Sequence, residues 1–217
     1  SHFETIGHDP KEIDITYENA QARERTNILM NLANKMNGLV LGTGNMSELA
    51  LGWCTYNGDQ MSMYAINAGI PKTLVKFMVK QFMCLQSEEL TMNEEDAKLL
   101  QETLADVLDT PISPELIDTP QHTEEIIGKY EIHDFILYHM LNNGDTEDRI
   151  YLLMKEAFKD EFSEEKLLEY LQIFYRRFYS QQFKRSAMPD GPKVLDISLS
   201  PRTDWRMPSD ADYRRRL

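Results

Sequence analysis

The residues best suited to chemistry lie around a glycine-rich turn. The apolar stretch at residues 38–41 leads into Gly42-Thr43-Gly44, and Glu48 follows in the first turn of an expected helix. After a parallel strand, glycines admit a ligand close to the backbone, and the N terminus of the next helix favours anions. Thr43 adds a hydroxyl group at the rim, and Glu48 is a carboxylate of the kind that Mg²⁺ prefers. The pattern indicates a site for a nucleotide phosphate.

Ordinary structural roles explain the same residues. Asn45 can cap the expected helix, and Glu48, three residues later, can complete a capping box. A similar choice arises for Asn19 and Arg23, which are four residues apart and therefore share one helical face. Together they could hold an anion, or they could belong to a solvated face. Spacing alone leaves both alternatives open.

Composition limits the kinds of partner. The chain has 217 residues, 41% of them hydrophobic, which is enough for one compact core. A formal net charge of −13 argues against a surface for duplex nucleic acid, because Lys and Arg dominate binding to phosphate backbones. No apolar stretch reaches the about 18 residues of a membrane span, and no secretory leader is visible. Two cysteines suit a reducing compartment, so we expect a cytoplasmic protein that binds neither nucleic acid nor membrane.

Hydrophobic periodicity predicts the elements that position these residues. A long helix is expected over residues 19–36, with a buried stripe formed by Ile28, Leu29, Leu32, Ala33 and Met36. Residues 38–41 are predicted to form a buried parallel strand, because they are apolar, few and flanked by glycine. Further helices are expected over residues 71–85, 94–108, 130–142, 147–158 and 163–182. The aromatic residues of the last helix are interpreted as core packing.

The remaining stretches are irregular. Residues 87–93 and 110–123 contain proline, acidic and small polar residues, and both are candidate mobile loops. From residue 186 onward the chain is rich in Pro, Ser and Asp. We therefore divide the sequence into a domain, residues 1–185, and an extended C-terminal tail, residues 186–217. Helices that alternate with a strand predict an α/β fold with a largely helical C-terminal portion.

Three long runs resemble the synthetase domain of glutamine-dependent NAD⁺ synthetases. They read TYENAQARERTNILMNLANK, LVLGTGNMSELALGWCTYNGDQMSMYAINAGIPKTLV and YSQQFKRSAMPDGPKVLDISLSPRTDWRMPSDA. The resemblance extends over residues 7–212, which makes it far more specific than a short motif. It implies a partial doubly wound parallel sheet of the adenine nucleotide hydrolase type, with residues 1–185 as the C-terminal part of the ammonia-ligase domain.

The resemblance also implies a reaction. Members of this family are ligases that form a C–N bond: ATP adenylates the nicotinate carboxylate of deamido-NAD⁺, pyrophosphate leaves, and ammonia then displaces AMP. ATP and Mg²⁺ are required, and a glutaminase domain of the full-length chain supplies the ammonia. Catalysis depends on positioning and electrostatics, so no nucleophilic Ser or Cys is needed. The family is commonly a homodimer, so we expect a homo-oligomer.

Carried over by position, the resemblance assigns roles to individual residues. Glu48 and Lys72 would be catalytic, with Glu48 also holding magnesium and Lys72 neutralising charge on the leaving phosphate. Contacts to ATP would come from Thr43, Lys72 and Ser113. Contacts to deamido-NAD⁺ would come from Asn19, Arg23, Glu48, Trp53, Cys54, Thr55, Tyr56 and Lys184.

Three features depart from the family pattern. The enzyme class carries a Ser-Gly-Gly-x-Asp-Ser phosphate loop, whereas this sequence has no adjacent glycine pair, and no glutaminase region is visible. We therefore expect an incomplete ATP site and low activity from this chain alone. Asn45 stands where related sequences often carry an acid, which puts magnesium affinity in question. Two other functions stay open: an ATP pyrophosphatase that amidates another acid, and a non-catalytic helical interaction module.

Overall fold

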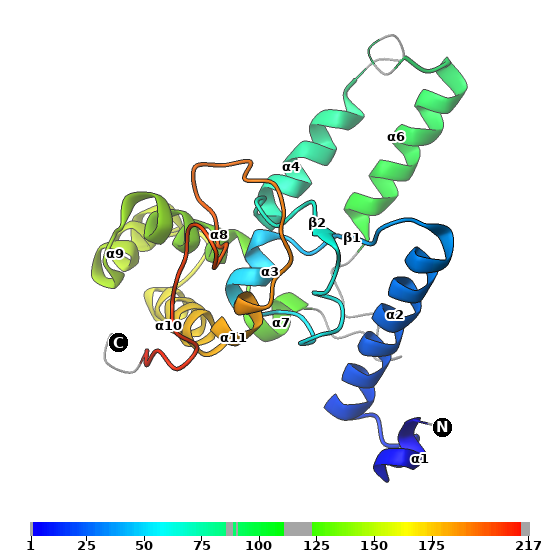
Figure 1. Ribbon diagram of the computed structural model, residues 1–217. Coiled ribbons are helices and arrows are strands. Elements are labelled where there is room, and N and C mark those ends of the chain that lie inside the picture. Colours follow the sequence, from blue (N-terminus) through cyan, green and yellow to red (C-terminus); the bar gives the residue numbers. More distant parts are fainter. Residues whose placement is uncertain (1, 86–88, 90, 111–122, 214–217) are drawn as a thin grey trace.

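A helical bundle with a small parallel sheet at its side forms the fold in the computed structural model, which describes residues 2–85, 89, 91–110 and 123–213 (Figure 1). The first half of the chain contains α1 (His2–Ile6), α2 (Ile15–Met36), β1 (Leu41–Gly42), α3 (Met46–Leu51), β2 (Tyr64–Ala65), α4 (Lys72–Met83) and α6 (Glu94–Asp109). The second half contains α7 (Thr123–Ile127), α8 (Tyr130–Tyr138), the π-helical turn η1 (His139–Asn143), α9 (Glu147–Ala157), α10 (Glu164–Ser180) and α11 (Gln182–Ser186).

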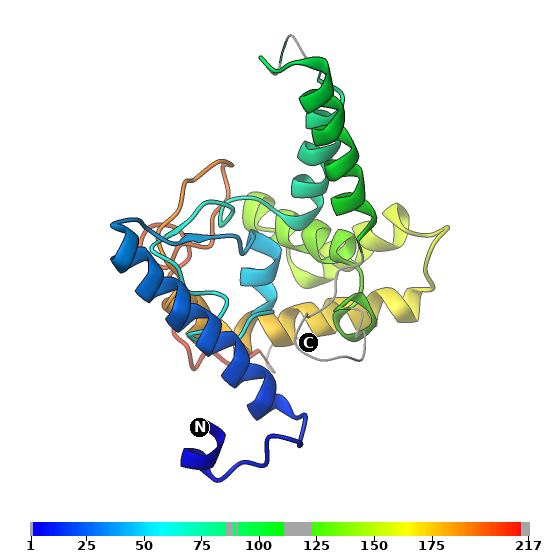
Figure 2. The ribbon, with the colours of Figure 1, turned by 90° about the vertical axis from the view of Figure 1, so that its right-hand side faces the viewer.

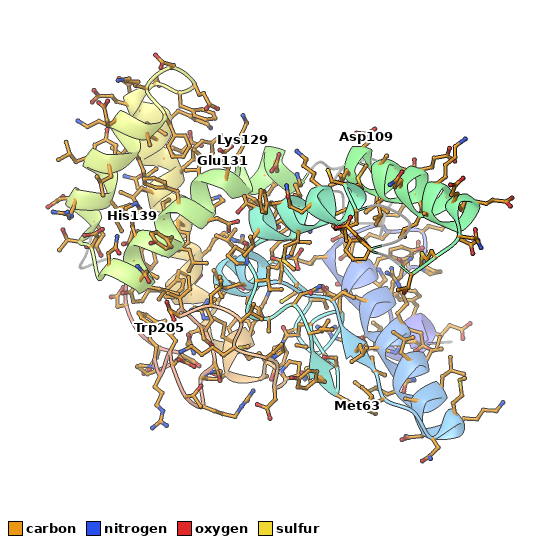
Figure 3. All side chains as sticks on the ribbon, turned by 90° about the horizontal axis from the view of Figure 1, so that it is seen from above. Met63, Asp109, Lys129, Glu131, His139 and Trp205 are labelled. Atoms are coloured by element: carbon orange, nitrogen blue, oxygen red, sulfur yellow. The ribbon has the colours of Figure 1, made fainter. Side chains whose placement is uncertain are left out.

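The elements fall into three regions. Helices α3, α8, α9, α10 and α11 gather into the bundle, α4 and α6 pack against each other as a projecting arm, and α2 lies at the edge (Figures 1 and 2). Seen from above, the arm extends away from the end of the bundle that carries His139 (Figure 3). Among the described residues, no helix combines the length and apolarity that crossing a bilayer requires.

The hydrophobic core lies between α3, α8, α9 and α10. Ser163 caps α10 by accepting the Lys166 backbone N–H, and the apolar residues of α10 then recur every three or four positions on its inner face. The predicted aromatic packing is confirmed, because the following residues are all at most 7% exposed: Tyr170, Phe174, Tyr175, Phe178 and Tyr179. Facing them from α8 and α9 are Ile132, Ile136, Ile150 and Met154, each 0% exposed.

The sheet consists of one β-α-β unit in the described part of the chain. β1 and β2 pair in parallel, with Leu41 opposite Tyr64 and Gly42 opposite Ala65, and α3 forms the crossover between them. The predicted parallel sheet and helical C-terminal portion are therefore confirmed. The prediction of a buried strand over residues 38–41 is wrong, because Leu39 and Leu41 are 60% and 55% exposed. Only β2 pairs with β1 in the described residues, and no described element covers these side chains.

Helix α2 differs from its prediction in two respects. It begins at Ile15, four residues before the predicted start, because Asp14 accepts the backbone N–H groups of Thr16 and Tyr17. Its apolar stripe is largely exposed, with the predicted core residues at these values: Ile28 48%, Leu29 50%, Leu32 44% and Met36 77%. Of the five residues of the predicted stripe, only Ala33, at 8%, is buried. The periodicity predicted the helix correctly but not its burial.

The other predicted helices agree with the structure to within four residues at each end. In the helix predicted over residues 71–85, Pro71 is the N-cap of α4 and the helix begins at Lys72. The helix predicted over residues 130–142 continues from α8 into η1. After α11 the chain runs without helix or strand to residue 213, yet Met188, Ile197 and Leu199 are buried against the core. Residues 190 and 191 lie beside β2 in space: Ala65 N–H donates to Asp190 O, and Gly191 packs against Ala65.

Candidate functional site

The N terminus of α3 is closed by the chain itself. Glu48 N–H donates to Asn45 Oδ1, and Asn45 N–H donates to Glu48 Oε2, both at 3.1 Å. This reciprocal pair is a capping box, so the structural interpretation of these residues is confirmed. Met46 N–H donates to Ile70 O at 2.9 Å. The backbone N–H groups of residues 45, 46 and 48 are therefore bonded within the protein.

Glu48 also contacts Lys72, the other residue to which the family resemblance assigned a catalytic role. Lys72 Nζ lies 3.0 Å from Glu48 Oε1, and both side chains are 22% exposed. The lysine ammonium also lies 5.8 Å from the centre of the Tyr130 ring. Lys72 is the first residue of α4 and Glu48 lies in the first turn of α3, so the ion pair joins the starts of two helices.

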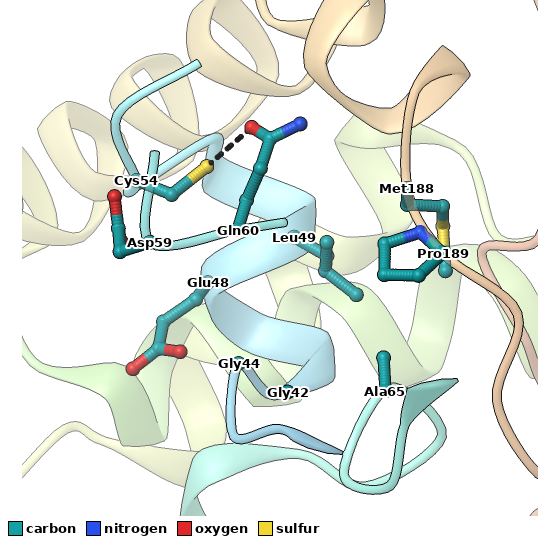
Figure 4. Close-up of a pocket in the computed structure, with 10 residues that line it drawn as sticks. All are labelled: Gly42, Gly44, Glu48, Leu49, Cys54, Asp59, Gln60, Ala65, Met188 and Pro189. Atoms are coloured by element: carbon teal, nitrogen blue, oxygen red, sulfur yellow. Dashed lines mark hydrogen bonds between the residues drawn. The ribbon is translucent and has the colours of Figure 1, made fainter. Parts of the chain in front are cut away.

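A pocket lies beside this pair. Its lining comes from β1 and the turn after it, from α3, from residues 54–60, from β2 and from the start of the tail: Gly42, Gly44, Glu48, Leu49, Cys54, Asp59, Gln60, Ala65, Met188 and Pro189. About 400 Å³ is free of protein atoms, open solvent included. Figure 4 shows Glu48 and Asp59 on one side of α3, with Met188 and Pro189 on the other.

The polar face of α2 is tied to the segment that follows α3. Thr55 Oγ1 donates to Asn19 Oδ1 at 2.8 Å, and Arg23 Nε donates to Tyr56 O at 3.2 Å. The backbones approach closely here, since a Cβ at Gly58 would lie 3.2 Å from Ala22 Cβ. Four residues that the resemblance assigned to deamido-NAD⁺ are therefore brought together by direct hydrogen bonds.

Three cations surround the C-terminal end of α3. Lys184 Nζ donates to Gly52 O at 2.8 Å and to Cys54 O at 2.6 Å, and Arg177 Nε donates to Leu51 O at 2.9 Å. Arg185, which is 0% exposed, donates to the carbonyl groups of α3 residues 49 and 50. Cations are favoured at a helix C terminus, and these bonds satisfy its last carbonyl groups. Burial lowers the pKa of both arginines and of Lys184.

The side chains of residues 53 and 54 are both engaged within the protein. The Arg177 guanidinium lies 5.1 Å from the centre of the Trp53 ring, in a cation–π contact. Cys54 Sγ donates to Gln60 Oε1 at 3.1 Å, and burial raises the pKa of this thiol to about 12. Cys54 therefore contains a protonated, poorly reactive thiol at neutral pH, which agrees with the absence of a nucleophile motif.

The predicted site residues mostly meet in one region. Thr43 is exposed on the turn between the two pocket-lining glycines, and its carbonyl group accepts Asn67 Nδ2. Ser113 lies outside the described residues. The remaining nine residues all lie on α2, α3, residues 53–56, the start of α4 or α11, which are linked by the hydrogen bonds given above.

A sequence model of the family described as NAD synthase matches residues 2–161. This match covers more than half of the chain.

The chain belongs to the NAD synthase family.

Individual relatives of this chain agree with that assignment. The glutamine-dependent NAD⁺ synthetase of Mycobacterium leprae is 46% identical over 225 aligned positions, which cover 93% of this chain and 32% of the relative. The protein of the same name from Acinetobacter baylyi is 32% identical, over 86% of this chain and 30% of its own length. The chain thus spans about a third of the length of the curated relatives it matches.

A solved structure supports the fold. The crystal structure of a glutamine-dependent NAD⁺ synthetase from Cytophaga hutchinsonii aligns with a TM-score of 0.68. The alignment covers 98% of this chain and 31% of the other chain, at 19% sequence identity.

The side chains available in this chain constrain how magnesium could bind. The described residues contain no group of three or more His, Cys, Asp or Glu side chains placed to hold a metal. Mg²⁺ is commonly held by one or two carboxylates together with substrate phosphates and water. Glu48 fits that mode, although its two oxygens are bonded to Lys72 Nζ and Asn45 N–H.

Asp59 and Arg177 are among the site residues that were not predicted from the sequence. Asp59 lines the pocket with Glu48 and accepts the Thr55 backbone N–H at 2.6 Å. Asp59 follows Asn57 and Gly58, and Asn57 has a positive φ of 56°, so the Asn-Gly-Asp turn after residue 56 was an available signal. Arg177 carried no such signal, because only tertiary packing places α10 against the end of α3.

Proposed function

We propose that this chain provides the synthetase chemistry of NAD⁺ formation. The reaction is the ATP-dependent amidation of deamido-NAD⁺: the nicotinate carboxylate is adenylated with release of pyrophosphate, and ammonia displaces AMP. In the longer protein, a glutaminase domain supplies that ammonia. The proposal rests on the family to which the chain belongs and on the geometry of the pocket region.

One observation carries the proposal. Hydrogen bonds join residues 53–56 to the polar face of α2 and to Lys184, at one side of the pocket. These residues follow the C-terminal end of the short helix α3, and the Glu48–Lys72 ion pair lies at the start of that helix. Elements separated by more than 160 residues in sequence converge here. Such a site can hold two substrates in a fixed relative orientation, which is the main requirement of an adenylation followed by an amine attack.

On the nucleotide side, three groups have roles. Lys72 neutralises charge that builds on the departing pyrophosphate, Thr43 contacts ATP from the turn after β1, and Ser113 adds a further contact. Magnesium, held by Glu48 with phosphate oxygens, supplies additional charge neutralisation when it is bound. Lys72 has three N–H donors, so it can exchange Glu48 for a phosphate oxygen while keeping its position on α4.

On the dinucleotide side, the groups differ in how they act. Lys184 uses two of its three donors to fix the backbone of residues 52–54, which leaves one direction for the ligand. Trp53 and Tyr56 provide ring surface, while Asn19 and Arg23 hold Thr55 and Tyr56 in place. The side-chain sulfur of Cys54 points to Gln60, so its contribution to binding comes through the backbone.

Calorimetric titration tests this assignment. Deamido-NAD⁺ should bind about tenfold more tightly than NAD⁺, because a carboxylate forms stronger hydrogen bonds than an amide. Arg23→Gln should weaken that binding, whereas Arg25→Gln, on a different face of α2, should not. Equal affinity for deamido-NAD⁺, NAD⁺ and GMP would defeat the proposal. Selective binding of GMP would favour a pyrophosphatase that amidates another acid, and no nucleotide binding at all would favour a helical interaction module.

Two further proposals concern assembly and location. We propose that the chain forms a homo-oligomer, because α2 exposes an apolar stripe and because Leu39, before β1, and Leu41, within β1, are also exposed. A cytoplasmic location rests on composition, since the sequence contains only two cysteines. Fractionation of cells that express the native gene would test the second point.

A further inference from the structure

A buried carboxylate outside the pocket links the two helices that carry Glu48 and Lys72. Asp134 lies on α8 and is 8% exposed. Its Oδ2 accepts the Thr73 backbone N–H at 3.0 Å and Thr73 Oγ1 at 2.7 Å. Its Oδ1 accepts Ser47 Oγ–H, and Ser47 Oγ in turn accepts the Lys72 backbone N–H at 2.8 Å. Asp134 therefore contacts α3 and α4 at once.

The contact supplies a cap that α4 lacks within its own sequence. Pro71 is the N-cap residue, and in the described structure it makes no side-chain capping bond. The first two backbone N–H groups of α4 are satisfied instead by Ser47 and Asp134, from two other helices. A negative charge beside the N terminus of a 12-residue helix is also favoured by the helix dipole. The position of α4 along its axis is thus fixed from α8.

The same hydrogen bonds fix the backbone positions from which the Glu48 and Lys72 side chains extend. Ser47 immediately precedes Glu48, and Thr73 immediately follows Lys72. Burial of the Asp134 carboxylate raises its pKa, while its hydrogen bonds to Ser47 and Thr73 act in the opposite direction. A buried carboxylate is costly unless donors surround it, and here the donors come from the two residues adjacent to the ion pair.

We propose that Asp134 is a positioning residue that sets the relative placement of Glu48 and Lys72. This inference rests on the proposed function only for the chemical role of Glu48 and Lys72. The relative placement of the two side chains is a property of the protein without any ligand. Asp134 is not among the residues that line the pocket. It acts on Glu48 and Lys72 through its hydrogen bonds to Ser47 and Thr73. Without this carboxylate, α3 and α4 lose their shared anchor and Lys72 separates from Glu48.

Site-resolved acetylation of lysines in the free protein tests the proposal without nucleotide. Lys72 should react with an amine-selective reagent about threefold to fivefold faster in Asp134→Ala than in wild type, because the ion pair with Glu48 is lost. Lys76, one turn further along α4, serves as the internal reference. Asp134→Asn should keep the wild-type rate, since its amide oxygen can accept Thr73 and its NH₂ can donate to Ser47.

A matched variant separates positioning from general loss of stability. Ile136→Val, two residues further along α8 at a site that is 0% exposed, lowers stability without touching the network, so its Lys72 rate should equal that of wild type. If Asp134→Ala does not fold, Ser47→Ala takes its place and should raise the Lys72 rate by a similar factor. An unchanged Lys72 rate in the folded variant overturns the proposal, whether or not the protein binds deamido-NAD⁺.

Discussion

Glu48 combines two physical roles that a pair of substitutions can separate. Its Oε2 accepts Asn45 N–H in the capping box, and its Oε1 pairs with Lys72. Glu48→Gln keeps an oxygen that can accept Asn45 N–H but removes the negative charge. Glu48→Ala removes both the oxygen and the charge. The two variants therefore differ in the cap and agree in the loss of the ion pair.

The expected cost of each change follows from these contacts. Loss of the capping bond costs about 1 kcal/mol of unfolding free energy. The Lys72 pair is partly exposed, at 22% for each side chain, so it contributes about 0.5–1 kcal/mol, toward the upper end for a surface pair. Glu48→Gln should therefore cost about 0.5–1 kcal/mol and Glu48→Ala about 2 kcal/mol. Both figures should fall as salt screens the pair.

Two measurements compare these variants: stability should differ between Glu48→Gln and Glu48→Ala, whereas the magnesium dependence of nucleotide binding should not. Urea unfolding at equilibrium should rank wild type above Glu48→Gln, and Glu48→Gln above Glu48→Ala. Under the proposed function, the magnesium dependence of nucleotide binding should be lost to the same extent in both, because a neutral amide is a poor ligand for Mg²⁺. Stability thus reports the cap, and magnesium dependence reports the charge.

Specific results would contradict this reasoning. Equal stability of Glu48→Gln and Glu48→Ala would mean that the side-chain oxygen contributes nothing to the cap. A magnesium dependence that survives in Glu48→Gln would remove Glu48 from the metal site, and its role would then be structural. Lys76→Met serves as a charge control on the exposed face of α4, and it should match wild type in both assays.

Three further predictions concern stability and assembly. Arg185→Met should lower the unfolding free energy by about 3–5 kcal/mol in urea unfolding, because buried carbonyl groups of α3 and α10 lose their donor. Arg176 is exposed on α10, and Arg176→Met should change the unfolding free energy by less than about 0.5 kcal/mol. Comparable losses in the two variants would contradict the stabilising role of the buried Arg185 hydrogen bonds. Burial lowers the pKa of His133 to about 4 in the folded state, below its ordinary value of 6.5, so the unfolded state binds the proton first as pH falls. Stability should therefore decline by up to about 3 kcal/mol between pH 6.5 and 4, and His133→Gln should show a shallower decline in unfolding measured across that range; an equal decline would show that His133 titrates normally. Sedimentation at high concentration should reveal a species heavier than the 25.3 kDa chain, and Leu32→Lys should reduce it more than Asn31→Lys does. A monomer at all concentrations would contradict the proposed assembly.

The local features of the fold could be predicted from the sequence because their causes are local. Asn45 and Glu48 are three residues apart, so a capping box was one of two stated interpretations, and the structure contains it. The helical pattern of α10 likewise predicted both the helix and its buried aromatic face, since the stripe is wide and apolar. Long runs of residues were also sufficient for the family, which the comparisons confirm.

Burial was harder to predict, because periodicity shows which face is apolar but not what covers it. The stripe of α2 has the same spacing as that of α10, yet Ile28 is 48% exposed and Phe174 is 0% exposed. The difference comes from neighbours: α8 and α9 pack on α10, whereas no described element covers the α2 stripe. The same reason applies to Leu41 in β1, which has one neighbouring strand in the described sheet.

The chain's order of residues by itself determined most of the helices and the capping box of α3, because these features depend on neighbours within about one turn. Tertiary structure alone decided that Asn19 meets Thr55, that Lys184 holds the backbone after α3, and that Asp134 joins α3 to α4. Those contacts join residues 36 to 130 positions apart. Their geometry depends on how the helices pack, and helix packing is set by the whole core rather than by any one segment.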